Sequence, residues 1–149
     1  MIETKRELID VFQTGAEMRR IVELYWSDLG RWLDLNFLTY FNFVCALPYR
    51  ADPNDTETVS RPIYLLKENY SPRDCDDKSV LIASWMHGNG IMCKFTAIST
   101  QPDGEPCHVF TTLENGLDVD ATYPEYHGML GNYPYYKDVT NRVDLTEWF

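Results

Sequence analysis

A cysteine between carboxylates, at the expected start of an apolar helix, is the residue in this sequence best placed for covalent chemistry. Cys75 lies in the run Asp-Cys-Asp-Asp at residues 74–77, before a mostly apolar stretch that ends at Met86. Either Asp74 or a capping box that begins at Ser71 would place the cysteine in the first helical turn. Unpaired N–H groups and the helix dipole favour an anion there, so the thiol could be activated. A small core residue at a helix start is the alternative interpretation.

A histidine and an aspartate further along the chain could complete a site for nucleophilic catalysis. His108 begins an expected strand, and Asp120 lies in the next strand, after a turn at residues 114–116. A three-residue turn would put the two side chains on one face of the hairpin as diagonal neighbours. We therefore predict that His108 bonds Asp120 through one ring nitrogen and directs the other toward the sulfur of Cys75.

The order and surroundings of these residues resemble the transglutaminase-like superfamily of cysteine enzymes, and in particular its short bacterial and bacteriophage members. The resemblance covers residues 57–124. It is carried by the motif Asp-Cys-Asp-Asp-Lys-Ser at residues 74–79 and by Asp-Ala-Thr-Tyr-Pro at residues 120–124, with a histidine at a strand start between them. The family usually has glycine two residues before the cysteine, where this chain has Arg73.

The resemblance implies a role for each of three residues. Cys75 would be the nucleophile, His108 its base, and Asp120 the group that orients the histidine. An amide would form an acyl-thioester on Cys75, and the backbone N–H of Cys75 could help to bind the oxyanion. Water as acceptor would make the protein a peptidase or amidase, and an amine would make it a cross-linking transferase. Hydrolysis of a peptide or protein substrate is favoured, because the small microbial members resemble peptidases.

Neighbouring charges and an alternative metal site bear on this assignment. Asp74 and residues 76–77 would repel a thiolate, and we expect them to point outward and to compensate the helix dipole. A zinc site of Cys75, Cys93, Cys107 and His108 is disfavoured, because no CxxC spacing is present. We expect neither a metal nor a cofactor.

Composition indicates one globular domain with an acidic surface. The chain has 149 residues, of which 44% are hydrophobic and 24% charged, and its net charge is −10. No Lys/Arg cluster accompanies this charge, so binding to nucleic acid is not expected. The apolar segment 35–49 is too short for a membrane span. No signal-peptide pattern begins the chain, and its four cysteines are scattered, which predicts free thiols in the cytoplasm or within a virus particle.

A long helix is expected near the N-terminus, from a capping box at Thr4 and Glu7 to about Trp32. Its apolar stripe over residues 8–32 would pack on its own domain or form a surface for another chain or for self-association. The members of the stripe are Leu8, Val11, Gly15, Met18, Val22, Tyr25, Leu29 and Trp32. Residues 36–49 predict a second buried helix, and a short helix is expected from Ser60 to about Lys67.

Alternating patterns later in the chain predict an antiparallel sheet, so the fold class is α+β, with the Cys75 helix packed on the sheet. On the first strand, Lys94 and Thr96 would occupy the more polar face. The expected strands span residues 91–100, 107–113 and 117–122. The expected parts of the single domain 1–149 are a helical part (1–50), a catalytic core (57–124) and an irregular, aromatic-rich C-terminal flap (125–149).

A second functional class stays open beside the enzyme. The chain could be a non-catalytic structural or assembly protein, such as a bacteriophage virion component, that retains the fold with an idle cysteine. The stripe at residues 8–32 and the aromatic content of 14% favour this alternative, because both could build interfaces.

Overall fold

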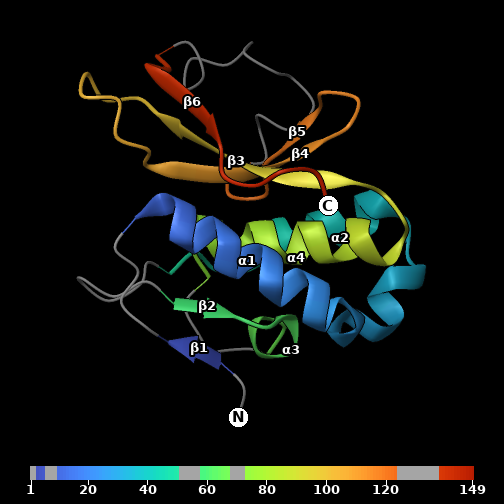
Figure 1. The fold of residues 1–149 in the computed structure, drawn as a ribbon. Helices are drawn as coiled ribbons and strands as arrows, with labels where there is room; N and C mark the ends of the chain where they lie inside the picture. The colour runs from blue at the N-terminus through green and yellow to red at the C-terminus, as the bar shows by residue number, and fades with distance from the viewer. Residues whose placement is uncertain (1–2, 6–9, 51–57, 68–72, 124–137) are drawn as a thin grey trace.

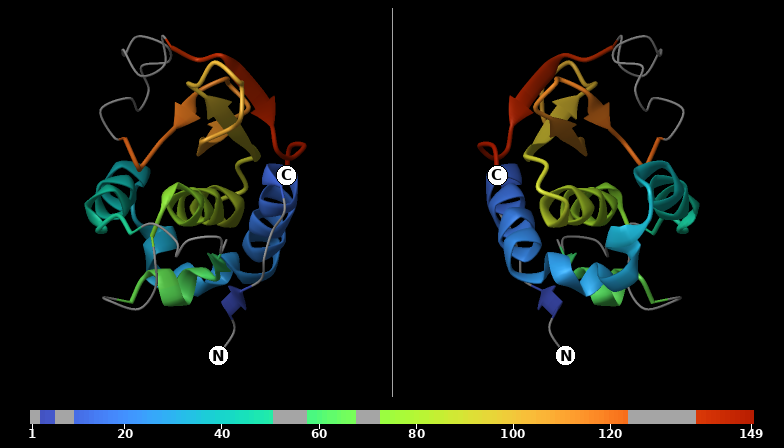
Figure 2. Two further views of the ribbon diagram at one scale, coloured as in Figure 1. Left: turned by 90° about the vertical axis from the view of Figure 1, so that its left-hand side faces the viewer. Right: turned by 90° about the vertical axis from the view of Figure 1, so that its right-hand side faces the viewer.

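A helix that carries Cys75 lies at the centre of the fold, with a four-stranded sheet on one side of it (Figure 1). This helix is α4 (Cys75–Gly88), and Figure 2 shows α1 (Val11–Tyr25) and α2 (Phe37–Ala46) on its two flanks. Helices beside an antiparallel sheet make an α+β fold, as the sequence predicts. The computed structural model describes residues 3–5, 10–50, 58–67, 73–123 and 138–149.

The central position of α4 follows from its residues, since every residue from Asp76 to Met86 is buried. The helix begins at Asp74, which is the N-cap: its carboxylate accepts the N–H groups of Asp76 at 3.0 Å and Asp77 at 3.2 Å. The Asp77 carboxylate in turn accepts the N–H of Asp74 at 3.1 Å, which completes a capping box. Of the two expected helix starts, the structure shows the one at Asp74.

The first helix begins later than the capping pattern at Thr4 predicts. Glu3–Lys5 form a short strand, β1, which pairs antiparallel with β2 (Thr58–Ser60). The N-cap of α1 is Asp10, whose carboxylate accepts the N–H of Gln13 at 2.8 Å. The prediction of a helix start at Thr4 is therefore wrong, because strand pairing with a distant segment takes these residues. Glu7 and Leu8 lie outside the described residues.

The apolar stripe of residues 8–32 does not lie on one continuous helix. After α1 ends at Tyr25, the chain continues as a 3-10 helix, η1 (Trp26–Asp34), which is interrupted at Gly30 with φ 54° and ψ −122°. Within the described part, the stripe packs on its own domain, so its buried side chains are not available to another chain. The buried members are Gly15, Met18, Val22 and Leu29. Val11, Tyr25 and Trp32 pack against the same core.

The four strands are antiparallel and lie in the order β5-β4-β3-β6. The first two expected strands are confirmed, and the third is shorter than residues 117–122. The flap prediction is wrong for residues 141–144, which form an edge strand on β3, and residues 124–137 lie outside the described part. The strands are β3 (Cys93–Ser99), β4 (His108–Leu113), β5 (Asp118–Val119) and β6 (Asn141–Asp144).

Both faces of the sheet are buried at its centre. Phe95 and Val109 belong to the core that includes α4, while Thr96 and Phe110 lie on the opposite face and are also inaccessible to solvent. The sequence predicts a half-buried strand with Thr96 on its more polar face, and the structure buries that face at Thr96. On that second face, the Arg142 guanidinium lies over the ring of Phe110, at 5.4 Å from the ring centroid.

A polar chain of contacts crosses this second face and joins the two edge strands. The hydroxyls of Thr96 and Thr112 lie 2.8 Å apart, and Thr112 donates to Asp118 at 2.8 Å. Arg142 of β6 donates to both carboxylate oxygens of Asp118 in β5, at 2.8 and 2.9 Å. The buried hydroxyls and the carboxylate are therefore satisfied by partners on every strand of the sheet.

We predict that Gly15→Ala destabilises the fold, although alanine is the better helix former by about 1 kcal/mol. A Cβ at Gly15 would lie 2.6 Å from the Cβ of Leu145, just after β6, so α1 and the sheet would have to separate. The expected loss is about 1–3 kcal/mol in the free energy of unfolding, measured by urea denaturation. Ala16→Gln, on the exposed side of α1, is the control, and equal stability of both variants would contradict the close contact.

Candidate active site

The hairpin of β4 and β5 has the register that brings His108 and Asp120 to one face. The N–H of Leu113 donates to the carbonyl of Leu117 at 2.9 Å, so the turn between them has three residues. Gly116 takes φ +89° in this turn, a conformation that favours glycine. Because side chains alternate along each strand, this register confirms that the two side chains share a face.

His108 and Asp120 form a short, buried hydrogen bond. The Nε2 of His108 lies 2.6 Å from an oxygen of Asp120, and the side chains are 4% and 2% exposed. The other oxygen of Asp120 accepts the N–H groups of Thr122 at 2.9 Å and Tyr123 at 3.1 Å. The ring of Tyr123 meets the imidazole edge-on, at 4.9 Å between centroids. The predicted bond is confirmed, and the carboxylate that orients the imidazole is itself held by the backbone.

Cys75 is positioned against β4 by the residue one turn further along α4. The Ser79 hydroxyl lies 2.6 Å from the carbonyl of Cys75 and 3.2 Å from that of Val109. The hydroxyl of Thr111 donates to the Ser79 carbonyl at 3.2 Å. The backbone of Val109 lies close enough to the sulfur of Cys75 to lower the pKa of the thiol. The first turn of α4 therefore lies beside the residue that follows His108.

The thiol itself hydrogen-bonds a carboxylate and not the imidazole. The sulfur of Cys75 lies 3.8 Å from an oxygen of Asp76. Among the described residues, no hydrogen bond joins this sulfur to His108, so the predicted contact is not formed in this structure. With Nε2 of His108 bonded to Asp120, the nitrogen that would receive the thiol proton is Nδ1.

The prediction that the carboxylates around Cys75 point outward is wrong. Asp74, Asp76 and Asp77 are 7%, 6% and 1% exposed, because the capping box and the packing of α4 enclose them. Burial, followed by the charges of Asp76 and Asp74, raises the pKa of the Cys75 thiol well above its usual value, and the N–H of Val109 opposes this. The resting thiol is therefore protonated, and a thiolate needs a base to take its proton.

Arg73 is buried where the resembled family usually has glycine. Its side chain is 1% exposed, donates from Nε to the carbonyl of Leu65 at 2.7 Å, and also donates to the carbonyl of Lys67. Leu65 ends the short helix α3 (Pro62–Leu65), so the arginine joins α3 to the start of α4. The approach to Cys75 therefore differs from that expected with glycine.

Two residues near the thiol were missed by the sequence analysis. Lys78 is 4% exposed, and burial lowers the pKa of its ammonium group. Burial, with the charges of Cys75 and Asp74, raises the pKa of Tyr49 to about 12. The position of Lys78 one turn after Cys75 was a usable signal, since i and i+3 share a helix face. Tyr49 follows α2 and had no signal, because tertiary packing alone brings it to this site.

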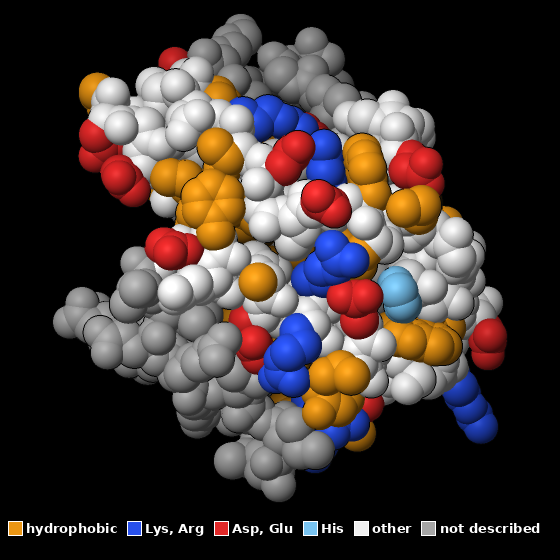
Figure 3. Space-filling model, viewed as in Figure 1, with side chains coloured by type: hydrophobic (Ala, Val, Ile, Leu, Met, Phe, Trp, Pro, Cys, Tyr) orange, Lys and Arg blue, Asp and Glu red, His pale blue; other side chains and the backbone are white. Residues whose placement is uncertain are grey.

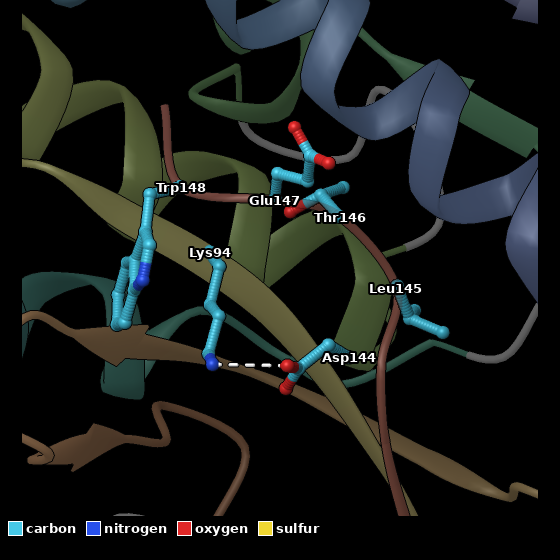
Figure 4. Close-up of a pocket in the computed structure, with 6 residues that line it drawn as sticks. All are labelled: Lys94, Asp144, Leu145, Thr146, Glu147 and Trp148. Carbon is cyan, nitrogen blue, oxygen red and sulfur yellow. Dashed lines mark hydrogen bonds and ion pairs between the residues drawn. The ribbon is translucent and has the colours of Figure 1, made fainter.

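Other candidate sites lie apart from these residues. An open groove of about 600 Å³ is drawn in Figure 4, where Lys94 pairs with Asp144 at 3.1 Å and lies 4.4 Å above the Trp148 ring. Figure 3 shows one face of the molecule, on which basic and acidic side chains alternate and hydrophobic ones form small separate groups. Within the described ranges, no group of three or more His, Cys, Asp or Glu residues could hold a metal. No helix in those ranges is long and apolar enough to cross a membrane.

Comparisons with known proteins add no assignment. No protein-family model, no curated protein and no solved structure matches this chain. Catalytic roles for Cys75, His108 and Asp120 stay predictions that depend on the geometry described above and on the resemblance of the two motifs.

We predict that Asp76→Asn increases the reactivity of Cys75 toward iodoacetamide. Removal of a negative charge beside the sulfur stabilises the thiolate, so the thiol pKa falls and more thiolate is present at a fixed pH below that pKa. A fall of one pKa unit would accelerate labelling about tenfold. Intact-mass spectrometry across a pH series measures this rate. Asp103→Asn, in an exposed turn, is the matched control, and an unchanged rate for Asp76→Asn would contradict the electrostatic account.

Proposed function

We propose that this protein is a cysteine hydrolase of the transglutaminase-like type, a peptidase or amidase that acts through an acyl-thioester on Cys75. One observation carries the proposal. A buried His108–Asp120 hydrogen bond of 2.6 Å lies on β4 directly beside Val109, whose backbone contacts the sulfur. In this proposal Cys75 is the nucleophile, His108 the base and Asp120 the group that orients the base.

The reaction would proceed in two stages, acylation and deacylation of Cys75, and His108 would accept and then donate a proton in each. Nδ1 takes the thiol proton while the sulfur of Cys75 attacks the carbonyl carbon of the amide, and Asp120 stabilises the imidazolium. Collapse of the tetrahedral intermediate breaks the C–N bond, and the imidazolium gives its proton to the departing amine. Water then attacks the thioester, with His108 as base, and releases the carboxylic acid and the free thiol. The N–H of Cys75, in the first turn of α4, would face the oxyanion.

The raised pKa of Cys75 shapes this mechanism. A thiol kept neutral by burial and by the charge of Asp76 is not ionised before the substrate binds. Proton transfer to His108 would therefore accompany the attack and would not precede it. This form of catalysis needs the base to approach the sulfur when the substrate binds, which agrees with the absence of a direct bond between Cys75 and His108 in the described structure.

A non-catalytic structural or assembly protein is the second candidate. The carboxylates that raise the thiol pKa favour it, because they oppose nucleophile formation. Its other support is weaker, since the apolar stripe of residues 8–32 is buried within the domain where it is described. The two candidates make opposite predictions for the reactivity of Cys75.

We predict that iodoacetamide labels Cys75 near neutral pH in a manner that depends on His108. His108→Ala and Asp120→Asn should each slow the labelling by about 10- to 100-fold, because the base or its orientation is lost. Exposed Cys107 is the internal control and should label equally in all variants, whereas Cys93 should stay unlabelled, since burial raises its pKa to about 12. Intact-mass analysis followed by peptide mapping gives the rates. If neither substitution changes the rate of Cys75 labelling, the result contradicts the enzyme and favours the non-catalytic candidate.

The acyl acceptor is tested separately, with a library of peptide amides offered with and without a primary amine. Hydrolysis predicts a peptide shortened or deamidated in water alone, with little product that contains the amine. Mass spectrometry of the peptides measures both products, and Cys75→Ala serves as the inactive control. A product dominated by the amine adduct would identify a transferase instead.

A further inference from the structure

The hydrogen-bond ladder between β4 and β5 opens beside Cys75. Thr111 pairs with Val119, so the same register would place Val109 opposite Ala121. The N–H of Leu113 points toward β5, and alternate residues of a strand point the same way, so the N–H of Val109 points toward Ala121. Among the described residues, no backbone bond joins Val109 to Ala121, and β5 ends at Val119.

Two side chains near the start of α4 contact the N–H of Val109 and the carbonyl of Ala121, which do not bond each other in the described structure. The N–H of Val109 faces the sulfur of Cys75 and favours its thiolate, which lowers the pKa of the thiol. The carbonyl of Ala121 accepts the Nζ of Lys78 at 3.5 Å. Cys75 and Lys78 are three residues apart and therefore lie on one side of the helix. The ladder is replaced at this point by two contacts with α4.

Lys78 is held in this position by a second contact. Its Nζ also donates to the carbonyl of Cys45, near the end of α2, at 3.2 Å. The ammonium is buried, and the charged or titratable groups that face it are Cys45 from α2, Asp120 from the segment after β5, and Arg73 from before α4. A buried ammonium is costly unless it makes specific contacts, and here both hydrogen bonds fix backbone carbonyls.

We propose that Lys78 is a positioning residue that holds Ala121 away from Val109. The N–H of Val109 then contacts the sulfur of Cys75 and does not bond the carbonyl of Ala121. The importance of this contact for catalysis rests on the proposed function of Cys75 as a nucleophile. By fixing the carbonyl of Ala121, Lys78 also fixes the residue next to Asp120 in the chain. One side chain thus sets the spacing between the nucleophile helix and the strand segment that orients the base.

The test replaces Lys78 with methionine, which has a similar length but no donor. In Lys78→Met, the carbonyl of Ala121 is released to pair with Val109, so the Val109 amide should exchange with deuterium at least tenfold more slowly than in the wild type. The midpoint of the pH profile for Cys75 alkylation should rise, because the thiolate loses a donor while Asp74, Asp76, Asp120 and Tyr49 still surround it. Heteronuclear NMR and intact-mass analysis give the two readouts.

Matched variants separate positioning from a general loss of structure. Lys78→Arg keeps a charged donor and should retain the wild-type exchange rate at Val109, and Lys78→Leu, which also has no donor, replaces Lys78→Met if the latter does not fold. Lys94→Met, which removes a lysine paired with Asp144 at the surface, should change neither readout. An unchanged Val109 exchange rate in folded Lys78→Met or Lys78→Leu overturns the proposal.

A double-mutant comparison links this role to His108 and keeps the two proposals apart. If Lys78 positions the site, His108→Ala should slow Cys75 labelling much less in the Lys78→Met background than in the wild type. Independent, multiplying effects would overturn the positioning role. If His108→Ala does not change the rate of Cys75 labelling, the proposed function is contradicted. The Val109 exchange rate would still show whether Lys78 keeps Ala121 from pairing with Val109.

Discussion

The burial of α4 is the constraint on which the rest of the structure depends. Its residues from Asp76 to Met86 are enclosed, so the sheet, α1, α2 and η1 must all pack around one helix. A helix buried on all sides leaves no solvent for the polar side chains in its first turns. Two of them contact neighbouring elements: Ser79 contacts β4, and Lys78 contacts α2 and the segment after β5.

This enclosure also explains the electrostatics of the candidate site. Asp74 and Asp77 are kept near the thiol because they cap the helix, and their position is a consequence of helix formation. The dipole at the helix start favours a thiolate, but burial and the neighbouring charges of Asp76 and Asp74 act in the opposite direction and dominate. A site of this kind depends on a base, since its thiol does not ionise readily.

The buried His108–Asp120 pair could be predicted from the sequence because it depends on local rules. A three-residue turn sets the hairpin register, and the alternation of side chains then decides which residues share a face. The start of α4 at Asp74, the helix after Asn36 and the first two sheet strands were predictable for the same reason. Caps, turns and periodicity act over a few residues, and distant contacts did not override them there.

Features that depend on distant segments were decided only by the tertiary structure. Pairing with residues 58–60 makes Thr4 part of a strand, although its local sequence predicts a helix start, and pairing with β3 makes residues 141–144 a strand. The inward position of Asp76 and the contact of Lys78 with Ala121 require the packed helix and the open ladder. By itself the sequence determined the chemical groups and their local register. The surroundings of the thiol depend on which elements pack against α4, and no local pattern encodes that choice.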